Sequence, residues 1–139
     1  MVTVLLVDDY SPMRQMLRDI LERYSDIKVI GEAGTGEEAV LQSTALHPSV
    51  VIIDMRLPTM TGVEATALIK RHSPSTTIIG LTADAPDYTG TAMRVAGAAT
   101  VLSKDDLLNT LHPAIIEEGM LSKIASHLPQ KRGLLRFGS

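Results

Sequence analysis

Five short apolar runs recur along the chain, and a segment with helical spacing follows each of them. Apolar runs without polar alternation are typical of strands that are buried on both faces. Strands that alternate with helices form a parallel sheet, because right-handed crossovers place the helices over its faces. We therefore expect strands at residues 3–7, 27–33, 50–53, 77–81 and 98–102.

The segments between these runs carry the signals of helices. Ser11 and Pro12 are typical of a helix start, with Ser11 as the N-cap. Further helices are expected at residues 37–46, 61–71 and 88–95, and a last one from Asp105 or Asp106 onward. The expected fold class is α/β: a doubly wound, five-stranded parallel sheet of flavodoxin-like order 2-1-3-4-5, with helices on both faces.

Polar residues stand where these strands end. Asp8 and Asp9 follow the first run, Asp54 the third and Thr82 the fourth, while Lys104 lies just past the fifth. In doubly wound folds, ligands bind outside the carboxyl ends of the strands, at the switch point between strands one and three. We therefore expect these side chains to converge on one edge of the sheet. Core packing alone gives no reason for such a set.

Three carboxylates at one edge require compensation. Two of them about 4 Å apart repel by roughly 4 kcal/mol at an effective dielectric near 20, so they bind a cation, protonate or separate. A site with oxygen ligands and no thiols favours Mg²⁺. Water molecules and phosphate oxygens usually complete the coordination shell of this ion. With a phosphate bound, Lys104 supplies a positive charge, Thr82 a hydroxyl donor, and Asp54 a carboxylate able to attack phosphorus.

Composition excludes several other classes of function. A length of 139 residues suits one domain, and the absence of cysteine excludes disulfides and thiolate metal sites. A net charge of −3 gives no electrostatic footprint for nucleic acid. No apolar span is long enough for a membrane helix. We expect a cytoplasmic protein that contacts neither nucleic acid nor membrane through this chain.

The order of these residues resembles a known family. The motif elements are Asp8-Asp9, Asp54 followed by Pro58 and Gly62, Thr82-Ala83, and Ser103-Lys104, and together they cover residues 3 to about 118. This combination resembles the receiver domain of response regulators in two-component signalling. Each element alone is weak, whereas the set in this order is specific.

The resemblance implies a phosphorylated signalling switch rather than a turnover enzyme. A histidine kinase or phosphotransfer protein would supply the phosphoryl group, Mg²⁺ would be the cofactor, and a homodimer would be an accessible state. The implied roles are Asp54 as phosphoacceptor, Asp9 as direct metal ligand, Asp8 as a ligand largely through water, the Arg56 main-chain carbonyl as a further ligand, Thr82 as the group that moves toward the phosphoryl group, and Lys104 as its holder.

Two segments are similar to NarL/LuxR-type regulators in particular. They are residues 31–39 and 104–106. That subfamily normally adds a DNA-binding domain, which implies a role in transcription regulation, but the residues after Ser122 are too few to form one. We expect a receiver domain at residues 1–120, and a C-terminal extension or the start of a linker at residues 121–139. A stand-alone receiver and the receiver part of a longer regulator both fit.

Two alternative functions are left open by the sequence. Receiver domains usually carry Tyr or Phe three residues before the lysine, where this chain has Val101, so an interaction module that signals without phosphate is the first alternative. The second is a phosphatase of the haloacid dehalogenase type. It needs a second Asp two residues after the nucleophile, where Arg56 stands instead. We also hypothesise that Arg56 and Asp84 tune hydrolysis of the acyl phosphate, against the alternative of a surface ion pair.

Overall fold

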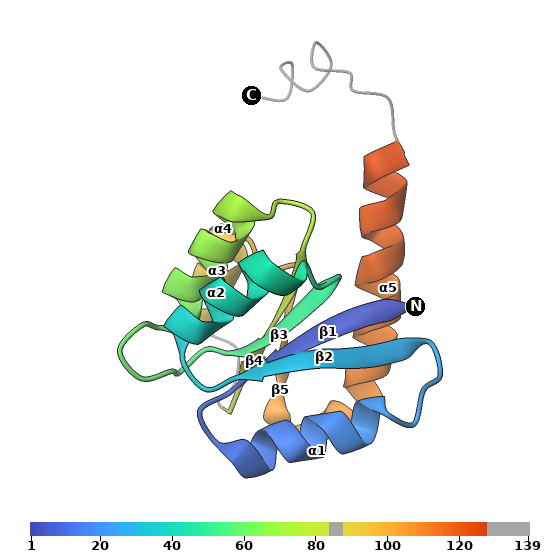
Figure 1. Ribbon diagram of the computed structural model, residues 1–139, viewed down its shortest axis with the longest axis horizontal. Coiled ribbons are helices and arrows are strands. Elements are labelled where there is room, and N and C mark those ends of the chain that lie inside the picture. The colour runs from blue at the N-terminus through green and yellow to red at the C-terminus, as the bar shows by residue number, and fades with distance from the viewer. Residues whose placement is uncertain (84–87, 128–139) are drawn as a thin grey trace.

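Five parallel strands form one sheet of order β2-β1-β3-β4-β5, as the sequence predicts (Figure 1). The structure is a computed structural model that describes residues 1–83 and 88–127, with side chains for residues 1–83 and 90–121. The elements in chain order are β1 (Val2–Val7), α1 (Ser11–Leu21), β2 (Ile27–Ala33), α2 (Gly36–Leu46), β3 (Val50–Asp54), α3 (Gly62–His72), β4 (Thr77–Thr82), α4 (Tyr88–Ala96), β5 (Thr100–Ser103), the 3₁₀ turn η1 (Lys104–Asp106) and α5 (Leu107–His127).

Helices cover both faces of the sheet, and the sheet divides the core into two layers (Figure 1). Because successive side chains of a strand point to opposite faces, each central strand contributes to both layers. Leu6 and Ile52 pack with Leu17 of α1 and Leu111 of α5. The opposite layer contains Leu5, Val7, Val51 and Ile53 with Ala39 of α2, Ala65 of α3 and Met93 of α4.

The strand register brings the carboxyl ends of the central strands to one level. Val7 of β1 pairs with Ile53 of β3, and Asp54 pairs with Leu81 of β4. At the next pair of strands, Thr82 lies opposite Ser103 of β5. Residues that follow these positions therefore emerge at the same edge of the sheet.

The turn from β3 into α3 is fixed by local signals in the sequence. Thr61 forms a capping box with Glu64, in which each side chain accepts a hydrogen bond from the other residue's backbone N–H. The Gly62 N–H donates to the Met55 carbonyl at 3.0 Å. A side chain at Gly62 would press against the Asp54 carbonyl oxygen, so glycine is required by close backbone approach.

Helix α5 is the longest helix and continues past the edge of the sheet (Figure 1). Up to residue 121, where side chains are described, its buried residues are Leu107, Leu111 and Ile115, one turn apart along one face. Met120 and Leu121 are more than half exposed. The helix runs without a break from residue 107 to residue 127, and so it crosses residue 120, where the sequence predicts that the receiver domain ends.

Within the described part of the chain, no helix is both long and apolar enough to cross a membrane.

Candidate phosphoryl-accepting and metal site

Asp8, Asp9 and Asp54 form an acidic cluster at the carboxyl edge of the sheet. One carboxylate oxygen from each lies within 4.8 Å of the others. Asp54 ends β3, and Asp8 and Asp9 follow β1, so the two strands at the switch point supply the cluster. Asp8 and Asp54 are buried, whereas Asp9 is exposed. The structure thus brings together the three carboxylates predicted from the sequence.

Lys104 joins the two buried carboxylates of this cluster. Its Nζ donates to Asp8 Oδ2 at 3.0 Å and to Asp54 Oδ2 at 3.1 Å. The ammonium group reaches them from η1, directly after β5. A buried carboxylate is costly unless it is paired, so one lysine compensates both acidic side chains.

Backbone N–H groups hold the second oxygen of each buried carboxylate. Tyr10 N–H donates to Asp8 Oδ1 at 2.9 Å, and Arg56 N–H donates to Asp54 Oδ1 at 3.1 Å. Each carboxylate is therefore bound on both oxygens and has a fixed orientation.

The role of the Arg56 carbonyl as a metal ligand stays a prediction. Asp84 lies outside the described residues.

The electrostatics of the site favour a bound cation. Burial raises the pKa of Asp54, and the Asp8 charge raises it further, although the Arg56 N–H and Lys104 act in the opposite direction. For Lys104, burial lowers the pKa, but the bonds and charges of Asp8 and Asp54 outweigh it, so its pKa is raised. The lysine stays charged, and its single positive charge leaves the acidic cluster with excess negative charge.

The donor set of the cluster fits a hard divalent cation. Oxygen ligands of one octahedral Mg²⁺ lie about 3 to 4.2 Å apart, which the cluster can reach with a small contraction or with bridging water. Asp8, Asp9 and Asp54 supply only oxygen donors. Because Asp9 is exposed, solvent reaches the cluster from its side.

Thr82 and Lys104 lie where the sequence predicts, at the end of β4 and just after β5. Thr82 ends β4 next to the strand that carries Asp54, and it is buried. Lys104 reaches the cluster by direct contact. The five predicted residues therefore come from the carboxyl ends of four neighbouring strands.

Sequence reasoning missed one residue that contacts the loop carrying the cluster. Arg14 Nη1 donates to the Asp8 main-chain carbonyl at 2.6 Å, and Arg14 Nε donates to Glu32 at 2.8 Å. The sequence signal is weak: Arg14 and Arg18 lie one turn apart on α1, which is a common arrangement on exposed helix faces.

Met93 of α4 and Val101 of β5 both lie beside Gly80 of β4. Met93 is fully buried, and its Cε would lie 2.8 Å from a Cβ on Gly80, which pairs with Val101. Val101 Cγ2 would lie 3.4 Å from the same atom. The region between α4 and the sheet is thus packed by a long flexible side chain together with a short one.

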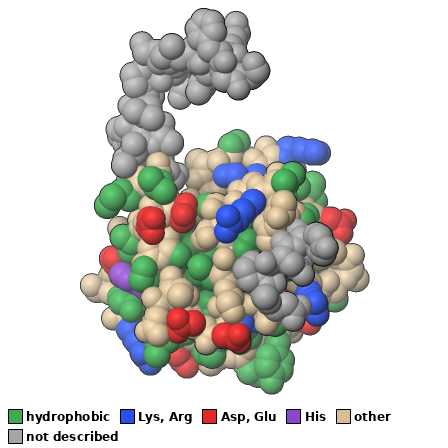
Figure 2. All heavy atoms as spheres, turned by 180° about the vertical axis from the view of Figure 1, so that it is seen from behind, with side chains coloured by type: hydrophobic (Ala, Val, Ile, Leu, Met, Phe, Trp, Pro, Cys, Tyr) green, Lys and Arg blue, Asp and Glu red, His purple; other side chains and the backbone are tan. Residues whose placement is uncertain are grey.

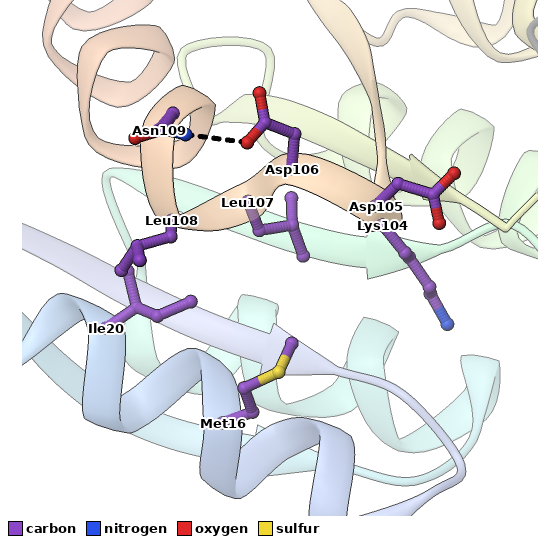
Figure 3. Close-up of a pocket in the computed structure, with 8 residues that line it drawn as sticks. All are labelled: Met16, Ile20, Lys104, Asp105, Asp106, Leu107, Leu108 and Asn109. Carbon is purple, nitrogen blue, oxygen red and sulfur yellow. Dashed lines mark hydrogen bonds between the residues drawn. The ribbon is translucent and has the colours of Figure 1, made fainter.

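A pocket of about 320 Å³ lies beside Lys104, between α1 and the start of α5 (Figure 3). Met16 and Ile20 of α1 face Leu107 and Leu108 across it. Met16 and Leu108 are exposed. Four apolar side chains thus line the pocket together with polar residues of η1 and α5, and Lys104 joins it to the acidic cluster.

A family model for the response regulator receiver domain matches residues 4–116. The chain belongs to this family. It is 35% identical over 115 residues to the response regulator GacA of Pseudomonas protegens, covering 83% of this chain and 54% of GacA. It is 43% identical over 104 residues to the response regulator UvrY of Escherichia coli O6:H1, covering 75% of this chain and 48% of UvrY. The receiver chain spans about half the length of these relatives.

The match extends to an enzyme and to a solved structure. A protein-glutamate methylesterase/protein-glutamine glutaminase of Idiomarina loihiensis is 37% identical over 126 residues, covering 83% of this chain and 32% of that protein. The signal receiver domain of NarL from Mycobacterium tuberculosis superposes with a TM-score of 0.81 at 25% identity, covering 86% of this chain and 96% of that one. The fold and the family expected from the sequence are confirmed.

Proposed function

We propose that this receiver domain is a phosphoryl-accepting switch, with Asp54 as the acceptor and Mg²⁺ as the cofactor. The observation that carries the proposal is the bridge from Lys104 to Asp54 and Asp8, beside the open carboxylate of Asp9. This arrangement presents the Asp54 carboxylate as the acceptor and the Lys104 ammonium group as a fixed positive charge. It also leaves an acidic cluster that can bind Mg²⁺. The first alternative, signalling without phosphate, lacks such support. The charged residues that phosphorylation needs, Asp8, Asp9, Asp54 and Lys104, are all present at the site.

The proposed reaction is transfer of a phosphoryl group to a carboxylate oxygen. An Asp54 oxygen forms a bond to phosphorus as the phosphorus–nitrogen bond to the donor histidine breaks. The leaving imidazole keeps the bonding electron pair and takes a proton from water. Mg²⁺, held by Asp8, Asp9, Asp54 and, as predicted, the Arg56 carbonyl, would neutralise charge on the phosphoryl oxygens. Lys104 would bind a phosphoryl oxygen, and the Thr82 hydroxyl would donate to another.

The chemical nature of the label tests this reaction. A small phosphodonor such as acetyl phosphate should label the chain in the presence of Mg²⁺. An acyl phosphate on Asp54 should be released by hydroxylamine at neutral pH, whereas a phosphoester on Ser or Thr should survive. A label that resists hydroxylamine would contradict the proposal.

The partner that donates the phosphoryl group is proposed to be a histidine kinase or a phosphotransfer protein. The pocket between α1 and α5 supports this, because a partner helix seated on Met16 and Leu108 would lie next to Lys104. Leu108→Asp should slow transfer from such a protein about tenfold or more and leave labelling by acetyl phosphate unchanged. An equal loss with both donors would argue against docking at this pocket.

We infer that the chain itself signals and does not turn over a substrate. Its relatives include both response regulators and a methylesterase, and it covers 32% of the methylesterase.

Acidic, basic and apolar side chains are interspersed on the face seen in Figure 2, with no continuous basic region for nucleic acid. Residues 121–139 are proposed to be an extension or linker, which would lead into a DNA-binding output domain in a NarL/LuxR-type transcriptional regulator.

A further inference from the structure

Asp9 differs from the other two carboxylates in how it is held. Asp8 and Asp54 are each bound on both oxygens. The Asp9 carboxylate makes no hydrogen bond or ion pair with any residue that the structure describes, and it is exposed. Its position at the cluster therefore depends on the backbone that carries it.

Arg14 fixes that backbone through the peptide group between Asp8 and Asp9. The Asp8 carbonyl accepts from Arg14 Nη1 at 2.6 Å, a short, charge-assisted bond. Because a peptide group is planar, holding this oxygen also fixes the direction in which the chain enters Asp9. On the other side of Asp9, the Tyr10 N–H is held by Asp8 Oδ1. Asp9 thus lies between two anchored peptide groups.

Glu32 of β2 holds Arg14 in this position and compensates its charge. Glu32 Oε1 accepts from Arg14 Nε at 2.8 Å, and Oε2 accepts from Arg18 Nη2 at 2.7 Å. The Glu32 carbonyl in turn accepts from Gln42 of α2 at 2.7 Å. The guanidinium group is therefore anchored to the sheet, and the Glu32 carboxylate offsets a positive charge that would otherwise repel a cation at the cluster.

We propose that Arg14, anchored by Glu32, is a positioning residue that presents the Asp9 carboxylate to the divalent cation. The inference rests on the cation site of the proposed function and adds a residue outside the acidic cluster. Groups that orient metal ligands typically change metal affinity by 10- to 100-fold when they are removed. Among the described residues, Arg14 makes no hydrogen bond or ion pair with the carboxylates of Asp9 or Asp54, so its effect should reach the chemistry through cation binding.

Direct titration of the metal tests the inference. Isothermal titration of Mg²⁺ into the whole chain should give a Kd about tenfold or more weaker for Arg14→Gln than for wild type. The matched control is Arg18→Gln, which also removes a guanidinium–Glu32 pair but makes no bond to Asp8. That variant should keep the wild-type Kd within about twofold. Arg14→Lys keeps the charge without the two-pronged geometry and should lie between.

A second readout separates positioning from general destabilisation. Labelling of Asp54 by acetyl phosphate should be slow in Arg14→Gln at low Mg²⁺ and should recover to within about twofold of wild type at saturating Mg²⁺. A structural defect would lower both rates. If Arg14→Gln does not fold, the same pair of measurements on Arg14→Lys decides the question.

The outcomes distinguish this inference from the proposed function. If wild type binds Mg²⁺ and is labelled, but Arg14→Gln binds Mg²⁺ as tightly as wild type or no more weakly than Arg18→Gln, the positioning role is wrong and the proposed function stands. If wild type binds no Mg²⁺, both are wrong.

Discussion

Lys104 Nζ lies 3.1 Å from Asp54 Oδ2, although the two residues are 50 positions apart in the sequence. The same nitrogen binds Asp8 Oδ2 at 3.0 Å. Lysine thus occupies coordinating oxygens that a divalent cation would also use. The ammonium group and the cation are therefore expected to compete for these two carboxylates.

Replacing this lysine tests the competition. Lys104→Met leaves two carboxylates buried without a cation, so the unfolding free energy should fall by about 1–3 kcal/mol in metal-free buffer. Mg²⁺ should bind more tightly than to wild type, because no ammonium group must be displaced. Lys70→Met is the control, since Lys70 donates to the Pro74 and Thr76 carbonyls, away from the cluster. Weaker Mg²⁺ binding in Lys104→Met would contradict the competition.

Neutralising Asp54 should stabilise the metal-free fold at neutral pH. Burial, assisted by the Asp8 charge, raises the pKa of Asp54, so the folded state favours its neutral form. The stability that Asp54 contributes is therefore greatest at low pH and falls as pH rises from about 4, the value in the unfolded chain, through the folded value. Asp54→Asn should unfold at a higher temperature than wild type at pH 7.

The pH dependence of that difference is the decisive part. Thermal unfolding of both proteins between pH 7 and about pH 4 should show the two midpoints converging as Asp54 becomes protonated. Added Mg²⁺ should also narrow the gap, because it binds and stabilises wild type more strongly. A gap that is independent of pH would mean that the Asp54 charge is not its cause.

Gly62 should tolerate no side chain, because the backbone after Asp54 approaches it closely. A Cβ at this position would lie 2.7 Å from Met55 Cα and against the Asp54 carbonyl oxygen. Gly62→Ala should lower the unfolding free energy by about 2–4 kcal/mol. Gly119→Ala in α5 is the matched control: it meets nothing within 4 Å, and should stabilise by up to about 1 kcal/mol. Denaturant unfolding of the two variants would show the contrast.

Val101 and Met93 should be energetically coupled through the space above Gly80. Val101→Tyr alone should destabilise by about 1–3 kcal/mol, because an inward ring meets Met93. Met93→Ala alone should cost about 2–5 kcal/mol by leaving a cavity. In the double variant the ring can occupy that cavity, so the combined cost should be smaller than the sum by about 1 kcal/mol or more. Additive costs would show that the two positions do not share a space.

The fold and most of the site could be predicted because both follow from where apolar runs end. Strands buried on both faces leave a clear signal, and parallel strands place their carboxyl ends at one edge. Asp8, Asp54 and Lys104 each stand next to such an end, so their meeting required no knowledge of side-chain geometry. The capping box at Thr61 is likewise a local sequence signal.

Contacts of long side chains between elements could not be predicted in the same way. Arg14 reaches from α1 to Glu32 of β2, and no sequence period links the two positions. The expected N-cap at Ser11 was also wrong: α1 begins at Ser11, its N-cap is Tyr10, and no side-chain capping bond is made. The Tyr10 carbonyl accepts from Met13 N–H, while its own N–H is used by Asp8 Oδ1. The Asp8 side chain thus holds the residue that caps this helix.

Phosphorylation at Asp54 is the central claim, and intact mass measurement tests it most directly. Wild type and Asp54→Asn are incubated with acetyl phosphate, each with Mg²⁺ and with a chelator. Wild type with Mg²⁺ should gain the mass of one phosphoryl group, whereas the chelated sample and Asp54→Asn should gain none. A folded wild-type protein that stays unmodified with Mg²⁺, or an Asp54→Asn variant labelled to the same extent, would contradict the account.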